Sequence, residues 1–177
     1  MTNNSQDQPK VYRDGYDLPV YGLDIGQFYA IHIPALVCIF ISLLSAVAVL
    51  LYSFKGKNCK TFFTWTKSER FVVYMAIFDG LFNISHFTDH LHYIITRNHP
   101  TPRRVCELYG FLIAEFKAGQ MLMVNVVAIN AFVLIYFRKN INFGKWDRRL
   151  LLWTFGIPFV GAVIALCFGK MGPNGTL

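Results

Sequence analysis

The stretch that decides the fold is residues 71–95, FVVYMAIFDGLFNISHFTDHLHYII, which is long and mostly apolar yet carries several ionisable side chains. A helix needs roughly 20 mostly apolar residues to cross the hydrocarbon core of a membrane. Asp79, Asn83, His86 and His90 follow one another at spacings of 4, 3 and 4 residues, so they share one helical face. Polar groups in lipid are costly and face a bundle interior or a wet cavity. The stretch therefore predicts a membrane helix with an inward polar face.

Three more stretches are long and apolar enough to cross a membrane. Together with residues 71–95, the four candidate membrane helices lie at about 28–54, 71–95, 106–137 and 150–168. We therefore expect an all-α membrane protein, a bundle with four helices within residues 29–177. Residues 1–28 are polar and contain Gly and Pro breakers, so we expect an extracellular tail with little structure of its own.

Composition supports a membrane protein. The chain has 177 residues, 54% of them hydrophobic and only 15% charged, and its mean hydropathy is +0.39. Soluble domains carry about 25% charged residues, so an ordinary soluble enzyme is excluded, as is a disordered chain. The net charge of +7 comes from cations clustered between apolar stretches. This pattern indicates contact with a lipid bilayer and not with nucleic acid.

The cations also predict the orientation. Segments 55–70 and 138–149 together hold ten Lys and Arg, against six on the other side of a four-pass chain. The positive-inside rule places both segments in the cytoplasm and the N-terminus outside. We expect residence in the plasma membrane. Two glycosylation sequons, at Asn3 and Asn174, fall on the outside in this topology.

His86 and His90 have the spacing of a helical metal-binding pair. Zinc needs three or four ligands, and no Cys or Glu nearby obviously completes the set. We therefore predict no metal, and we favour a histidine-rich helix end near the headgroups. The same residues could sense pH, because His titrates near neutrality. No catalytic motif is present, so we expect neither enzyme activity nor a cofactor.

The third stretch carries Glu115 and Lys117, which are two residues apart and so point in different directions on a helix. They are not expected to pair with each other. Lys117 can pair across the bundle with Asp79 or Asp89, or it can meet an anionic group of a ligand. Both alternatives stay open at the level of sequence.

Several landmarks together resemble the first four helices of a G protein-coupled receptor. Residues 75–82, MAIFDGLF, look like the second-helix motif of that superfamily, and Cys106 opens a long third helix. Trp153 followed by Pro158 looks like its fourth-helix pair. The runs CELYGFLI (106–113), VAINAF (127–132), FGIP (155–158) and GPNG (172–175) look most like cyclic-AMP-receptor-like and fungal glucose-sensing receptors.

This resemblance implies a seven-helix receptor represented by its first four helices. It would pass an unidentified extracellular signal to a heterotrimeric G protein, and it could form a homo-oligomer. Cys106 would form a disulfide with a cysteine beyond Leu177, so we expect a truncated chain. The expected ligand pocket comprises Lys117, Glu115, His86 and His90. The expected polar network comprises Asp79, Asn83 and Asn125. The expected G protein-facing residues are Asn130, Arg138, Lys139, Arg148 and Arg149.

Two other hypotheses fit the same residues. One is a transporter or proton-conducting subunit that uses Asp79, Glu115, Lys117 and the histidines as a relay. The other is a four-pass scaffold in which the polar residues only lock helices together.

Overall fold

All regular structure in the computed structural model, which describes residues 15–57 and 59–173, is helical. The long helices are α1 (Phe28–Phe54), α2 (Lys67–Thr96) and α3 (Arg103–Phe137). A fourth span consists of α4 (Arg148–Leu151), a π-helical segment η4 (Leu152–Gly156) and α5 (Ile157–Cys167). Four helices are long and apolar enough to cross a membrane. The predicted all-α class with membrane character is therefore confirmed.

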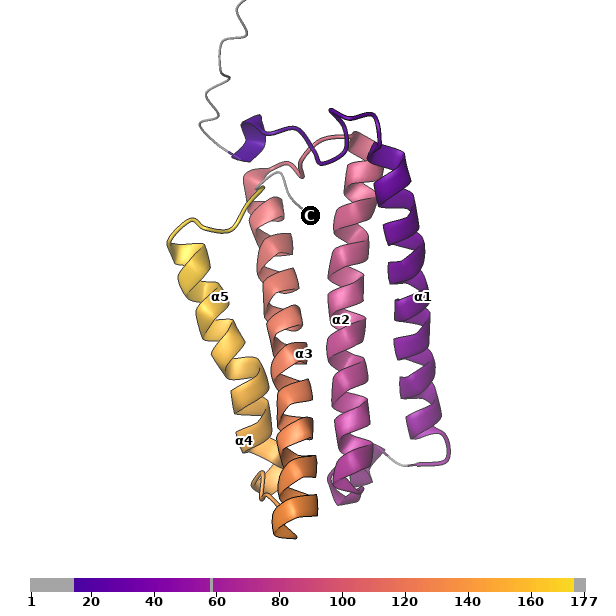
Figure 1. The fold of residues 1–177 in the computed structure, drawn as a ribbon, viewed down its shortest axis with the longest axis vertical. Helices are drawn as coiled ribbons and strands as arrows, with labels where there is room; N and C mark the ends of the chain where they lie inside the picture. Colours follow the sequence, from indigo (N-terminus) through magenta and orange to yellow (C-terminus); the bar gives the residue numbers. More distant parts are fainter. Residues whose placement is uncertain (1–14, 58, 174–177) are drawn as a thin grey trace, which may run out of the picture.

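The helices stand side by side in chain order, α1 against α2, α2 against α3 and α3 against α5 (Figure 1). Each neighbour runs antiparallel to the last, because the connections are short. The 3₁₀ turn η2 (Cys59–Thr64) joins α1 to α2, and η3 (Lys145–Asp147) precedes α4. We call the end that holds η2 and η3 the basic end and the opposite one the tail end.

Helix α2 begins four residues before the apolar stretch that predicted it. Thr66 and Glu69 form a capping box: the Thr66 hydroxyl accepts from the Glu69 amide, and the Glu69 carboxylate accepts from the Thr66 amide. This reciprocal pair satisfies two amides of the first turn, so the helix extends through a polar segment that hydropathy alone does not mark.

The fourth span contains a π-helical turn instead of a simple bend. Pro158 has no amide hydrogen, and its ring crowds the carbonyl group of Thr154 one turn earlier. The π-helical segment η4 ends two residues before Pro158, and the Thr154 hydroxyl donates to the Leu150 carbonyl oxygen at 3.0 Å. The predicted bend at Pro158 is thus accommodated by local widening of the helix, as is common for π-bulges.

Residues 15–27 differ from the expectation of an exposed tail with little structure. They begin with the 3₁₀ turn η1 (Gly15–Asp17) and fold over the tail end of the bundle (Figure 1). Val20 is buried, the Tyr21 carbonyl group accepts from His32 of α1, and the Leu18 carbonyl group accepts from His99 of the connection between α2 and α3. These contacts, together with a hydrogen bond from the Tyr16 hydroxyl to the Pro100 carbonyl oxygen, dock the segment. Asn3 and Asn174 lie outside the described residues.

The apolar core lies toward the basic end, between α2, α3 and the fourth span. Its buried members are Phe71, Tyr74, Phe78, Met123, Phe143 and Leu150. Gly119 permits the close approach at its centre. A Cβ atom at this position would lie 2.5 Å from Phe78 Cε1 and 2.9 Å from the Thr154 carbonyl oxygen.

Candidate functional site

Three histidines form a hydrogen-bonded chain at the tail end. His32 of α1 lies 3.0 Å from His90 of α2, Nδ1 to Nδ1, and His90 Nε2 lies 2.9 Å from His86 Nε2. His32 Nε2 donates to the Tyr21 carbonyl oxygen at 3.2 Å. His32 and His90 are fully buried, while His86 Nδ1 is buried without a hydrogen-bond partner. The pair predicted from sequence therefore belongs to a trio that joins two helices and the N-terminal segment.

The trio is not arranged as a metal site. His90 uses both ring nitrogens for its two histidine neighbours, so the three rings form a line and do not converge on one point. Among the described residues no group of His, Cys, Asp and Glu side chains is placed to hold a metal ion. The arrangement suits proton binding and exchange between adjacent imidazoles.

A second polar cluster, the midspan network, joins α1, α2 and α3 about two turns closer to the basic end. Asp79 accepts hydrogen bonds from Gln120 Nε2 at 3.1 Å and from Ser42 Oγ at 3.4 Å. Asn83 Nδ2 donates to Ser42 Oγ at 2.9 Å. Asn125, which was predicted to join this network, is exposed on α3 and has no hydrogen bond to it. Ser42 and Gln120 take that place.

Glu115 and Lys117 point in different directions on α3. Glu115 is buried, and neither carboxylate oxygen has a hydrogen-bond partner within the described chain. Lys117 is exposed but interacts electrostatically with His86. Lys117 forms no ion pair with Asp79 or Asp89, so neither alternative pairing considered from the sequence is present. The four predicted pocket residues therefore lie in one half of the bundle, where the two histidines are hydrogen-bonded, Lys117 acts on His86, and Glu115 has no hydrogen-bond partner within the described residues.

At the basic end, a buried ion pair fixes the second basic loop to α2. Arg70 Nε lies 2.6 Å from Asp147 Oδ2, its second nitrogen lies 3.1 Å from Oδ1, and the Tyr74 hydroxyl also donates to Oδ2 at 3.1 Å. Lys67 Nζ donates to the Ile141 carbonyl oxygen at 2.6 Å. Arg70 also donates to the Trp65 carbonyl oxygen. We call this cluster the loop lock, because it connects residues more than seventy positions apart in the chain.

The predicted G protein-facing residues divide between the surface and the bundle. Arg138, Lys139, Arg148 and Arg149 are exposed at the basic end. Asn130 differs, because it is only partly exposed and its side-chain oxygen is buried without a partner. Trp146 adds to the surface, since it is 48% exposed and its ring centroid lies 4.7 Å from Lys145 Nζ and 5.0 Å from Arg148 Cζ.

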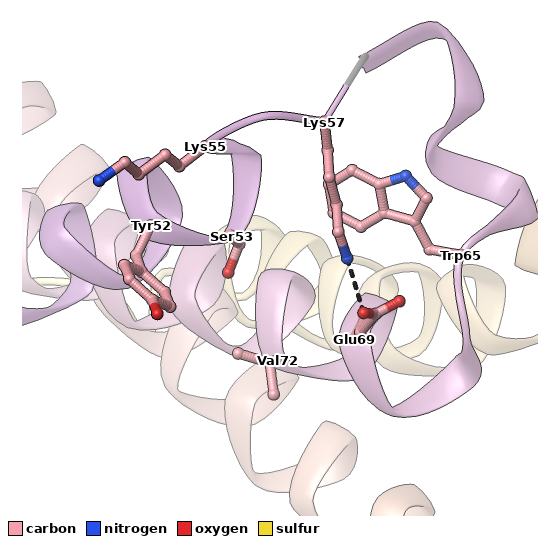
Figure 2. A pocket seen from close by; sticks show the side chains of 7 residues that line it. All are labelled: Tyr52, Ser53, Lys55, Lys57, Trp65, Glu69 and Val72. Carbon is pink, nitrogen blue, oxygen red and sulfur yellow. Dashed lines mark hydrogen bonds and ion pairs between the residues drawn. The ribbon is translucent and has the colours of Figure 1, made fainter.

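A neighbouring pocket opens between the basic end of α1 and the start of α2. Figure 2 shows Lys57 lying along the Trp65 ring while its ammonium group points at Glu69, 2.6 Å away. Lys55 points away from this pair (Figure 2). The pocket has a volume of about 560 Å³ and is lined by Tyr52, Ser53, Lys55, Lys57, Trp65, Glu69 and Val72.

Cys106 is buried at the tail end of α3 beneath Tyr16. The Tyr16 hydroxyl donates to the Pro100 carbonyl oxygen at 2.9 Å and also contacts the Cys106 thiol. Burial raises the pKa of Tyr16 to about 12, and the neighbouring thiol contributes in the same direction. All four cysteines are free thiols in this structure.

Two features of these clusters were not predicted from the sequence. His32 carried a signal, because it is the one side chain in stretch 28–54 of a type that can carry charge near neutral pH. The Arg70–Asp147 pair carried none, since both residues lie in separate basic segments and only the folded loop brings them together.

Comparison of the chain with protein-family models, with curated proteins and with solved structures gives no match.

Proposed function

We propose that the chain is the N-terminal part of a seven-helix receptor of the plasma membrane that couples an extracellular signal to a G protein. In this proposal the tail end faces outward and the basic end faces the cytoplasm. The motif resemblance and the charge asymmetry of the loops support this assignment.

The observation that carries the proposal is the exposure of α3. Only 6% of its most apolar window is buried, against 39% for α2, although α3 bears several polar side chains. Lys117 and Asn125 are exposed within the span and have no hydrogen bond within the described residues. Polar groups at membrane depth require a protein or water-lined environment. Further membrane helices packed against α3 would supply it, which fits a bundle larger than four.

The basic end supports the same proposal. The loop lock holds the second basic loop in a defined position, so the exposed Arg138, Lys139, Arg148 and Arg149 form a fixed cationic surface. A cationic surface attracts a partner with complementary acidic groups and raises the rate of encounter. Two packings of the bundle that present this surface differently would transmit the signal.

The test measures nucleotide exchange on purified heterotrimeric G proteins. Membranes would carry the product of the complete transcript, either wild type or with Arg148→Glu and Arg149→Glu combined. We expect basal exchange above that of mock membranes and its loss in the double variant. A matched control, Arg104→Glu, changes an exposed cation at the tail end and should leave exchange unchanged. Exchange equal to mock membranes with every class of G protein would overturn the proposal.

The histidine chain favours a second candidate, a proton-conducting membrane subunit. It predicts proton flux into vesicles that hold the purified chain, measured with an entrapped pH-sensitive dye. The histidine chain would form only the tail-end part of a proton path across the membrane, because no hydrogen bond within the described residues connects it to the midspan network. Flux abolished by His90→Phe would favour conduction over signalling.

A further inference from the structure

One carbonyl group determines the hydrogen positions along the whole histidine chain when all three rings are neutral. A neutral imidazole has one N–H donor and one lone-pair acceptor. The Tyr21 carbonyl oxygen can only accept, so His32 Nε2 carries the hydrogen and His32 Nδ1 is an acceptor. His90 must then donate from Nδ1, which makes its Nε2 an acceptor for the Nε2 hydrogen of His86. The hydrogen-bonded chain of histidines therefore ends in a lone pair at His86 Nδ1.

When the three histidines take up one proton, His86 Nδ1 gains a hydrogen, whichever of the three rings holds the added proton. A proton on His86 leaves hydrogens on both of its nitrogens. A proton on His90 makes its Nε2 a donor, so His86 Nε2 becomes the acceptor and the hydrogen of His86 moves to Nδ1. A proton on His32 has the same result through His90. In each case His86 Nδ1 changes from an acceptor to a donor.

The end of the histidine chain has no partner, because His86 Nδ1 is buried and accepts no hydrogen bond within the described residues. Glu115 of α3 is also buried without a partner, but it lies five residues from Gln120, about 140° around the helix from the side chain that meets Asp79. Lys117, and not Glu115, is the residue of α3 that acts on His86.

We propose that His32, His90 and His86 form a binding site for a single proton, whose uptake turns His86 Nδ1 from an acceptor into a donor. The described packing is then the proton-free state. The proton-bound state has a buried donor at His86 Nδ1 that needs an acceptor, so the tail end of the bundle must repack around His86 or admit water to it.

The charges around the chain fit this assignment. Lys117 of α3 acts on His86, and the three histidines act on one another. The Lys117 ammonium group disfavours a second positive charge beside it, which fits the uptake of one proton only. Asp89 of α2 acts electrostatically on Tyr93 and Cys106, and the centroid of the Tyr93 ring lies 5.8 Å from that of His32.

This inference does not depend on coupling to a G protein, because proton binding belongs to the four helices described here. The test uses the full 177-residue chain in lipid nanodiscs with ¹⁵N-labelled histidine. The ¹⁵N signal distinguishes a ring nitrogen that bears hydrogen from one that bears a lone pair. Single His→Phe variants assign the five histidines.

At alkaline pH we expect lone pairs at His32 Nδ1, His90 Nε2 and His86 Nδ1. On acidification the trio should take up one proton in a single transition, and His86 Nδ1 should gain a hydrogen. A hydrogen on His86 Nδ1 at alkaline pH, or three independent protonations, would overturn the proposal. The wild-type spectrum decides this, whether or not any variant folds.

Two variants test the links. His90→Phe should make His32 and His86 titrate independently. His92 also lies on α2 but is not one of the three hydrogen-bonded histidines, so His92→Phe should leave the single transition intact. A single shared transition that persists in His90→Phe would contradict the hydrogen-bonded chain.

Discussion

Asp79 of α2 accepts a hydrogen bond from Gln120 of α3 at 3.1 Å, and the same carboxylate accepts from Ser42 of α1 at 3.4 Å. One side chain thus connects three membrane helices near the middle of their lengths. The contact sets the register of α2 against α3.

Loss of the Asp79 carboxylate should weaken the packing of these three helices. Interhelical hydrogen bonds in membranes contribute about 0.6 kcal/mol each on average, so Asp79→Ala should lower the free energy of unfolding by about 1 kcal/mol. Unfolding of the purified chain by increasing SDS in mixed micelles measures this change. Asn125→Ala, which removes an exposed amide outside the network, is the control and should have little effect. Equal losses in the two variants would contradict the network.

The loop lock should contribute far more than the exposed ion pair near it. Arg70→Met leaves the Asp147 carboxylate buried without its cation, which typically costs about 3–5 kcal/mol. Lys57→Met breaks the exposed pair with Glu69 and should cost less than about 1 kcal/mol. Limited proteolysis between Arg138 and Arg149 should accelerate in the first variant only. Similar proteolysis in both variants would show that the ion pair does not hold the loop.

Gly119 is the most sensitive small residue in the bundle. Gly119→Ala places a Cβ atom 2.5 Å from Phe78 and should destabilise the chain by about 1–3 kcal/mol, despite the better helix propensity of Ala. Gly161→Ala is the matched control, because no atom lies within 4 Å of its added Cβ. That variant should be neutral or more stable by up to about 1 kcal/mol. Thermal unfolding in detergent compares the two, and a stabilised Gly119→Ala would contradict the close packing of α2, α3 and η4.

Tyr16 should make stability depend on alkaline pH. Burial raises its pKa to about 12 from an ordinary value of 10.0, so its folded form favours the neutral phenol. This stabilisation is fully present below pH 10 and is lost as pH rises from about 10 to about 12, because the unfolded chain releases its proton first. The fall in stability across this window should be smaller in Tyr16→Phe than in the wild type.

The same variants probe Cys106. Tyr16→Ala should expose the thiol and increase its rate of maleimide labelling, whereas the exposed Cys167 should react equally in both proteins. No change at Cys106 would mean that Tyr16 does not cover it.

Much of the bundle followed from the sequence. The first helix was predicted at its observed bounds, because an uncharged apolar stretch bordered by polar segments leaves no other choice. The polar first turn of α2 was missed, although Thr66 and Glu69 carry the spacing of a capping box. The π-helical turn before Pro158 could not be predicted, since it depends on how the backbone relaxes around the ring.

The clusters were only partly predictable. Helical spacing placed Asp79, Asn83, His86 and His90 on one face, and the structure joins them to neighbouring helices. Their partners Ser42, Gln120 and His32 come from other helices. Which side chains become partners depends on how each helix is rotated about its axis and shifted along its neighbour, and the spacing of residues within one helix does not give either. Asn125 lies on a different face of α3 from the one that meets α2.

The most direct test of the central claim, that α3 is covered by further helices of the same receptor, is to sequence the transcript through the codon for Leu177. The account predicts an outer loop containing a cysteine, followed by three more apolar stretches of roughly 20 residues. A stop codon directly after Leu177 in every transcript would contradict it, and a scaffold or proton-conducting subunit would then explain the polar surface of α3 better.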